Sequence, residues 1–281
     1  MQGVPEHFEA TQDSAEFRHP AHRPGVELYR AHIVRHSFEP HAHDAYGLGA
    51  IESGAERFRY AGSEQFAGAG SLLLMNPDAL HTGRAETEDG WRYRMIYLDR
   101  DVLEQVTGDS AWSFDDAVRH DTARAARLGQ GLQALWYCTE PLAFDSLLAE
   151  LLDVVRPDAR VGRLARKQAR PRFAEVNDFL RAHLDQTVRL EDLAQLAGLS
   201  PFHFLRQFRA QHHVTPQQML MAYRMHEAKR RLAAGEAAAQ VAAATGMVDQ
   251  AHLTRSFARR YGVTPGRYQR QVRGRATVSG A

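Results

Sequence analysis

The stretch SPFHFLRQFRAQHHVTP, residues 200–216, occurs a second time as DQAHLTRSFARRYGVTP, residues 249–265. The offset is a constant 49 residues, and the copies share a histidine, an arginine, a phenylalanine and the closing Val-Thr-Pro. A segment with helical apolar spacing precedes each copy and ends at Gly198 or Gly246. Because glycine can close one helix and a Ser or Asp oxygen can cap the next, each copy is predicted to form a helix, a tight turn and a second helix.

Charge divides the chain into two unlike parts. Residues 163–281 contain 20 Lys and Arg against 8 Asp and Glu, whereas residues 1–162 contain 15 against 26. A strongly basic segment suits a polyanion, because phosphate contacts supply much of the sequence-independent affinity for DNA. Helices joined by a glycine turn also occur in domains that bind no DNA, but the repeat together with the charge predicts two helix-turn-helix motifs that read the major groove.

Residues 172–273 resemble the DNA-binding domain of AraC/XylS transcription regulators. The resemblance is carried by AGLS at 197–200, by Phe208-Arg209, by the connector 224–232, and above all by GMVDQAHLTRSFARRYGVTPGRYQ at 246–269. It implies a compact all-helical domain whose two recognition helices enter successive major grooves on one face of DNA, with RNA polymerase as a partner. The long helix between the motifs is expected to run from the Thr215-Pro216 cap to Leu232.

The first turns of each recognition helix should contact base edges, since that part of the helix enters the groove. Arg206 and Arg255 can present a bidentate fork to guanine, and Gln250 can pair with adenine. Arginines further along are expected to hold phosphates, and Phe208 and Phe257 to anchor the core. The residues predicted to contact DNA are Phe202, Leu205, Arg206, Arg209, Gln250, Ala251, Thr254, Arg255, Arg259 and Arg260.

From Glu27 onward the N-terminal half has the pattern of short strands. Its segments alternate or run apolar over a few residues, and they are broken by turn-forming residues such as Gly54, Gly70 and Asn76-Pro77. Several short strands at regular spacing favour a β-barrel or sandwich.

Two histidine-containing motifs make this half more specific. His41 and His43 after Pro40, together with GSLLLMNPDALH at 70–81, resemble the two motifs of the cupin jelly roll. The second piece is also similar to the effector-binding barrels of AraC-type regulators. The resemblance implies an α+β chain of two domains, a cupin-like β-barrel followed by helices and then an all-α domain with two helix-turn-helix motifs. Metal-binding cupins add a glutamate soon after the second histidine, and here Asp44-Ala45-Tyr46 follows instead.

His41, His43 and His81 allow two interpretations. Three imidazoles on facing strands suit Zn or Fe, but Asp44 would point to the other face, so no carboxylate is expected beside them. The favoured interpretation is that the histidines line a polar effector pocket, or bond to backbone at the barrel mouth, and that no cofactor is needed.

The last strand shows which side chains could line the barrel. Trp91, Tyr93 and Met95 share one face and Arg94 lies on the other, and one face must be inside, where the aromatic set could equally be ordinary core. An inward Arg57 or Arg94 would favour an effector with a carboxylate, with which a guanidinium pairs bidentately. The residues predicted to bind the effector are His41, His43, Tyr46, Arg57, His81, Trp91, Tyr93 and Arg94.

Past Asp99 the apolar spacing becomes helical, with leucine-rich stripes in residues 121–138 and 141–155. These stripes are expected to pack on the barrel and to form a dimer interface, and packing on the barrel alone is the alternative. The predicted organisation is a polar arm (1–24), an effector-binding domain with C-terminal helices (25–155), a linker (156–171), the DNA-binding domain (172–273) and a tail (274–281). A single cysteine, Cys138, and the lack of a leader or a membrane-length apolar run indicate a cytoplasmic protein.

The sequence as a whole predicts a DNA-binding transcription regulator, usually an activator in families of this kind, whose barrel senses a small polar metabolite. Its expected partners are double-stranded DNA, a small effector, a second copy of the chain and RNA polymerase, and no membrane. No catalytic residue is needed. Two alternatives remain open: a cupin-type metalloenzyme in the N-terminal half, and a DNA-binding protein without an effector.

Overall fold

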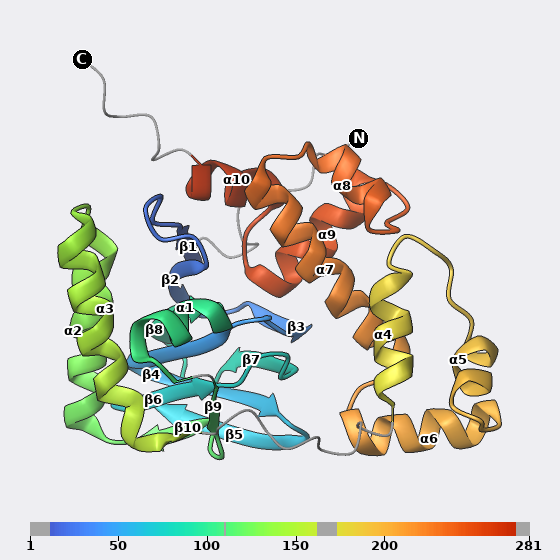
Figure 1. The fold of residues 1–281 in the computed structure, drawn as a ribbon, viewed down its shortest axis with the longest axis horizontal. Coiled ribbons are helices and arrows are strands. Elements are labelled where there is room, and N and C mark those ends of the chain that lie inside the picture. Colours follow the sequence, from blue (N-terminus) through green and yellow to red (C-terminus); the bar gives the residue numbers. More distant parts are fainter. Residues whose placement is uncertain (1–11, 110, 162–172, 274–281) are drawn as a thin grey trace.

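The computed structural model describes residues 12–109, 111–161 and 173–273. The strands are β1 (Ser14–Arg18), β2 (Val26–Ile33), β3 (Ser37–His41), β4 (Tyr46–Tyr60), β5 (Ser63–Gly68), β6 (Ser71–Met75), β7 (His81–Ala85), β8 (Trp91–Leu98), β9 (Trp112–Phe114), β10 (Val118–His120) and β11 (Ala159–Val161). The helices are α1 (Arg100–Thr107), α2 (Thr122–Tyr137), α3 (Pro141–Val155), the 3-10 turn η1 (Arg156–Asp158), α4 (Ala174–Ala182), α5 (Leu190–Leu196), α6 (Pro201–His212), α7 (Pro216–Ala234), α8 (Ala238–Ala244), α9 (Gln250–Tyr261) and α10 (Pro265–Arg273). The predicted fold class is confirmed, with a strand-rich half followed by a helical half (Figure 1). No helix in these ranges is long and apolar enough to span a membrane.

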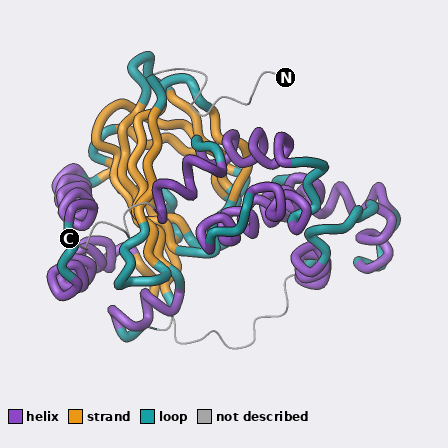
Figure 2. The backbone as a smooth tube through the Cα atoms, turned by 90° about the horizontal axis from the view of Figure 1, so that it is seen from above, coloured by secondary structure: helices purple, strands orange, loops and turns teal. Residues whose placement is uncertain are grey.

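Strand β4 organises the sheet because it pairs with four other strands. Its first half is antiparallel to β6 and β8, and its second half, Ala55–Tyr60, is antiparallel to β5 and β7. The register with β8 shifts between Ile51 and Ser53, so the strand bends where its partners change. The path β1-β2-β8-β4-β6-β10 and the branch through β7 to β3 together form a curled sheet, here called the barrel. Figure 2 shows these strands gathered together, with helices on both sides of them.

Side chains of the barrel alternate between two cores. Trp91, Tyr93 and Met95 of β8 belong to the interior cluster, whereas Ile96 belongs to a second cluster beneath α2 and α3. The leucine-rich stripes of α2 and α3 are buried in that second cluster, with Leu148 fully inaccessible to solvent. The two stripes therefore pack on the barrel, as expected. Both helices lie on the side of the barrel away from the helical half (Figure 1).

Two predicted boundaries are wrong. Residues 14–18, assigned to a polar arm, form β1, which pairs with β2 and buries Ala15 and Phe17. Residues 156–161, assigned to the linker, form η1 and β11, and β11 pairs with β9. In both places the unpaired backbone N–H and C=O groups of an edge strand pair with a short neighbouring segment. Amino-acid composition alone does not reveal such pairing. Residues 1–11 of the predicted arm, residues 162–171 of the predicted linker and the whole tail, 274–281, lie outside the described residues.

The two helix-turn-helix motifs are α5–α6 and α8–α9. Gly198 and Gly246 occupy the two turns, each with a φ of 65°, a left-handed conformation that favours glycine. Helix α7 joins the motifs and begins with a capping box, in which Thr215 and Gln218 each accept a hydrogen bond from the other's backbone N–H. It ends at Ala234, two residues beyond the predicted end.

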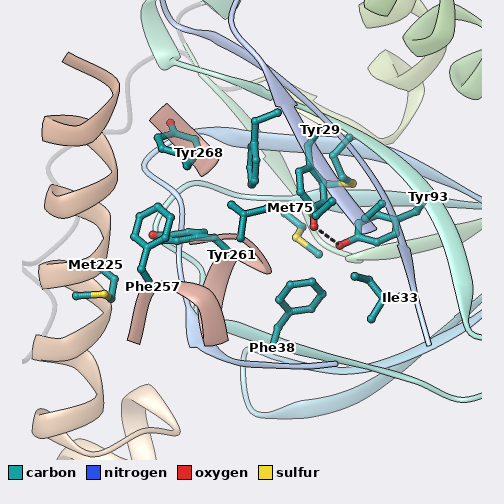
Figure 3. Close-up of a cluster of buried hydrophobic side chains, with 14 of the residues drawn as sticks. Tyr29, Ile33, Phe38, Met75, Tyr93, Met225, Phe257, Tyr261 and Tyr268 are labelled. Carbon is teal, nitrogen blue, oxygen red and sulfur yellow. Dashed lines mark hydrogen bonds between the residues drawn. The ribbon is translucent and has the colours of Figure 1, made fainter. Parts of the chain in front are cut away.

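The two halves share one core. The interior cluster of the barrel continues into the helical half, from Tyr29 and Phe38 to Phe257 and Tyr261 of α9. In Figure 3, Tyr261 and Tyr268 lie between α7 and the aromatic side chains of the barrel. The interior of the barrel is thus closed by residues of the DNA-binding half.

Candidate functional site

The recognition helices α6 and α9 expose their first turns. Arg206, Gln250 and Arg255 are exposed, and Phe202 is 71% exposed. The other predicted DNA contacts lie nearby, with Arg209 and Arg259 exposed and Leu205, Ala251 and Thr254 half-buried. The buried sides of the two helices carry Phe208 and Phe257, both fully inaccessible, in the anchoring role expected of them. Each helix therefore exposes side chains on its N-terminal turns, the part that would enter a groove, while its opposite side is packed in the core.

Arg260 lies where the prediction did not expect it. Its side chain is 7% exposed and donates to the carboxylate of Glu39 in β3 at 2.9 Å. Arg259 reaches the same carboxylate at 3.1 Å. The last turn of α9 therefore docks on the barrel, and in this arrangement Arg260 is not available to a phosphate, because Glu39 already neutralises it.

The interior of the barrel is filled by aromatic side chains. The hydroxyl of Tyr93 donates to that of Tyr29 at 3.4 Å, and Trp91 stacks on Tyr93 with ring centroids 5.6 Å apart. A hollow of only about 30 Å³ remains, which holds a water molecule or two but no metabolite. Arg260 and Tyr261 line it together with barrel residues, so α9 forms part of its wall.

The predicted effector residues divide into two groups. Those at or beside this hollow are His41, His43, His81, Tyr93 and Trp91. The hydroxyl of Tyr46 instead bonds to the backbone of Trp112 in the cluster beneath α2 and α3. Arg57 and Arg94 point outward and pair with acidic side chains on the outer surface of the barrel. These three side chains lie outside the hollow because each is on the outward alternation of its strand.

A buried carboxyl group that the sequence analysis missed lies in the hollow. Glu56 is 5% exposed, and burial raises its pKa to about 8. Its Oε1 would lie 2.5 Å from a Cβ added at Gly83, two residues along β7 from His81 and on the same face. The sequence contained a signal for this position. Glu56 is two residues before Phe58 and four before Tyr60, so all three side chains lie on the inward face of β4.

Strands β3 and β7 bring the three predicted histidines together. His41 and His81 are paired across the strands with ring centroids 4.3 Å apart, and the ring of His43 lies 5.2 Å and 5.3 Å from theirs. One nitrogen of each ring lies within 4.8 Å of the others. Burial lowers the pKa of all three imidazoles, so the rings are neutral at neutral pH.

A larger cavity of about 510 Å³ lies between the barrel and α7 and is here called the cleft. Its charged and titratable walls are formed by His19, Arg23, Glu27, His43, Asp44, Asp99, Arg100, Asp101, His226, Lys229 and Arg230. Lys229 Nζ lies 2.5 Å from Glu27 Oε1. Burial alone would raise the pKa of Glu27, but Lys229 and His19 hold it at about 2. His43 and Tyr97 line both the cleft and the hollow, so the two spaces meet at these side chains.

Comparison with known families matches both halves of the chain. Residues 23–152 match the AraC-like ligand binding domain, and residues 193–271 match a helix-turn-helix domain. Among curated relatives, the uncharacterised HTH-type transcriptional regulator YbfI of Bacillus subtilis is 31% identical over 243 residues, covering 81% of this chain and 86% of that protein. The MmsAB operon regulatory protein of Pseudomonas aeruginosa is 26% identical over 263 residues, covering 90% of this chain and 79% of that protein.

Solved structures share the two-domain fold at low sequence identity. The apo form of a ToxT variant from Vibrio cholerae superposes with a TM-score of 0.58 at 10% identity, covering 89% of this chain and 98% of that chain. Wild-type ToxT with a bound unsaturated fatty acid gives a TM-score of 0.51 at 11% identity, covering 89% of this chain and 95% of that chain.

Proposed function

This chain belongs to the AraC family of DNA-binding transcription regulators, and we propose that a small molecule bound at its barrel changes how α9 is presented to DNA. The matched families and relatives are regulatory, which leaves the metalloenzyme interpretation without support. The observation that carries the proposal is the shared wall of the hollow. Because Arg260 and Tyr261 of α9 line it, a ligand that enlarges the hollow on this side displaces the end of the second recognition helix.

The proposed entry site is the cleft rather than the closed barrel. The cleft has the volume of a small-molecule site, whereas the hollow beyond His43 and Tyr97 is too small without rearrangement. A carboxylate-bearing effector would compete with Glu27 for Lys229, and the apolar lining of the hollow would accept its remainder. The fatty acid bound to ToxT, a protein of the same fold, supports an effector of this general kind.

For DNA, we assign the base contacts to the exposed first turns of α6 and α9. Arg206, Gln250 and Arg255 are proposed to read base edges, and Phe202 to contact a thymine methyl. The remaining proposed contacts are Leu205, Arg209, Ala251, Thr254 and Arg259. Arg260 would join them only after α9 leaves β3.

Membership of the family is the basis for proposing an oligomeric state, a cellular location and a protein partner. We propose a cytoplasmic homodimer that contacts RNA polymerase and acts as an activator. Tyr137 and Leu142, 63% and 74% exposed where α2 meets α3, are large hydrophobic side chains that the described part of the chain does not cover. They are better placed for self-association than the buried stripes of the same helices.

The test fills the cleft without changing its charges. Ala233 of α7 lines the cleft, and its neighbour Ala234 is exposed and does not. A DNA fragment selected from the source genome is titrated with and without a panel of small carboxylic acids. We expect at least one acid to change the DNA affinity of the parent and of Ala234→Trp, but not of Ala233→Trp. An identical response of both variants would place the effector elsewhere, and no response to any acid in any of the three would count against a carboxylate effector.

A further inference from the structure

In the described structure, every arginine and lysine side chain that lines the cleft is already paired with a carboxylate. These side chains are Arg23, Arg100, Lys229 and Arg230, and their partners, in the same order, are Asp145, Asp78, Glu27 and Glu227. The nitrogen–oxygen distances of the four pairs are 3.7, 3.3, 2.5 and 2.7 Å. A ligand with negative charge alone therefore has to draw a cation of the cleft away from a carboxylate of the chain.

Most of the acidic side chains of the cleft, by contrast, have no cation beside them. Asp44, Asp99 and Asp101 line the cleft and form no ion pair with any residue that the structure describes. Burial and the neighbouring carboxylates of Asp44 and Asp101 raise the pKa of Asp99, which is the effect of a surplus of negative charge. The unpaired charges of the cleft are thus negative, and they favour a ligand that brings a positive group.

The ion pair between Glu27 and Lys229 is buried, so neither partner can lose the other without compensation. The side chain of Lys229 is 10% exposed and that of Glu27 is 11% exposed. The other carboxylate oxygen of Glu27 accepts from the hydroxyl of Tyr268 at 3.1 Å and lies 2.8 Å from Nε2 of His19, so Glu27 stays in place when Lys229 is drawn to another anion. A buried charge without a partner is strongly unfavourable. A simple carboxylic acid that took Lys229 would leave Glu27 in that state.

Four aromatic rings surround the ammonium group of Lys229. They belong to Phe17, Tyr97, Tyr261 and Tyr268, and their centroids lie 4.7 to 5.6 Å from Nζ. The faces of such rings attract cations, so the space beside Glu27 accepts an ammonium group of a ligand as well as that of the lysine. Tyr261 belongs to α9 and Tyr268 to α10, so a ligand cation in this space contacts the DNA-binding half directly.

His43 offers an unsatisfied nitrogen where the cleft meets the hollow. Its Nε2 is buried and has no hydrogen-bond partner within the described part of the chain. Burial and the charge of Lys229 lower the pKa of this imidazole, so the ring is neutral at neutral pH. A neutral ring nitrogen can accept from an ammonium group or donate to a carboxylate. Because a buried polar atom without a partner is unfavourable, His43 also favours a ligand whose polar groups reach this point.

We propose that the effector is a zwitterion, with a carboxylate that pairs with Lys229 and an ammonium group that pairs with Glu27. It inserts between the two side chains, so that one buried ion pair becomes two and neither charge is left alone. Amino acids and short amino-carboxylic acids are the chemical class that fits both these charges and a cleft of about 510 Å³. The insertion separates α7 from β2 and loosens one contact between the two halves of the chain. This inference rests on the proposed function, because it adds an ammonium group to the carboxylate effector assigned to the cleft.

The experiment compares matched ligands on the full chain in the absence of DNA. The probes are alanine, valine, β-alanine, γ-aminobutyrate and ε-aminocaproate, each with the acid that lacks its amino group and the amine that lacks its carboxylate. Affinity is measured by isothermal titration calorimetry, and the shift of the thermal midpoint is a second readout, because a ligand bound by the folded state stabilises it. We expect at least one zwitterion to bind about tenfold or more tightly than both of its single-charge analogues, since only the zwitterion compensates both buried charges.

Glu27→Gln is the diagnostic variant, because it keeps the size of the side chain and removes the charge that the ammonium group needs. It should abolish the preference for the zwitterion over the acid that lacks the amino group. Glu64→Gln is the control, since Glu64 is exposed on β5 and pairs with Arg57, which does not line the cleft. This variant should keep the preference of the parent. A preference that survives in Glu27→Gln would refute the pairing of the ammonium group with Glu27.

Equal affinity of the parent for each zwitterion and for its acid without the amino group would overturn the inference and leave a carboxylate effector standing. Amines that bind as tightly as their zwitterions would overturn both. No binding by any zwitterion would also overturn the inference, and the titration of DNA with carboxylic acids then tests the proposed function by itself. If Glu27→Gln does not fold, the comparison of the three ligand classes on the parent decides, because it needs no variant.

Discussion

Glu56 keeps its proton at neutral pH, because burial raises its pKa from 4.5 to about 8. Between these two values the folded chain holds a proton that the unfolded chain releases, so stability falls as the pH rises through that window. The cost is absent below 4.5 and fully present above about 8. We expect Glu56→Gln to remove this part of the pH dependence and to raise the urea midpoint at the alkaline end. Glu64→Gln, in an exposed position of β5, is the control, and parallel curves for the parent and both variants would contradict the assignment.

Arg255 is proposed to contact DNA because its side chain is exposed on α9. It lies on the exposed face of α9, in the second turn after the Asp249 cap. Arg255→Ala should cost about 1–3 kcal/mol of binding free energy and relax selectivity at one base pair. Fluorescence anisotropy with single-base-pair variants of a selected fragment measures both effects. Arg127→Ala removes the same charge from the exposed side of α2 and should leave affinity and selectivity unchanged. If Arg255→Ala behaves like Arg127→Ala, α9 does not enter the groove as proposed.

Helix α3 carries one leucine that packs on the barrel and another that is available for contact with a second copy of the chain. Leu148 is fully buried against the barrel, whereas Leu142, in the first turn of the same helix, is 74% exposed. Leu148→Glu places a carboxylate in an apolar core and should lower the free energy of unfolding by about 3 kcal/mol or more. Leu142→Glu should leave stability unchanged and, in the proposed dimer, favour the monomer in sedimentation velocity. A stable, monomeric Leu148→Glu variant would mean that the stripe is an interface after all.

The two halves of the molecule share a core and are also joined by a few charged contacts. Glu39 of β3 pairs with both Arg259 and Arg260 of α9, so one carboxylate fixes the last turn of the recognition helix. Glu39→Gln keeps the size of the side chain but removes the charge, and we expect it to raise DNA affinity in the absence of effector several-fold. Glu64→Gln, whose partner Arg57 is far from α9 in sequence and lies on β4, should have no effect. Lower affinity of Glu39→Gln would mean that docking on the barrel assists DNA binding.

The sequence by itself determined the helical half and the class of the barrel. The 49-residue repeat, its glycine turns and its capping residues are local signals, and local backbone preferences decide where such helices begin and end. Alternation along the strands likewise identified His41, His43 and His81 as candidates for one site before any pairing was known.

Only the tertiary structure decided which of two alternating faces is inside. Alternation says that Trp91 and Arg94 point in opposite directions, but which one lines the barrel depends on where α2 and α3 cover the sheet. The outward positions of Arg57 and Arg94, the inward position of Glu56 and the docking of Arg260 on Glu39 all follow from that choice. These contacts join residues far apart in the chain, so no local pattern encodes them, and they form only when the two halves close on a common core.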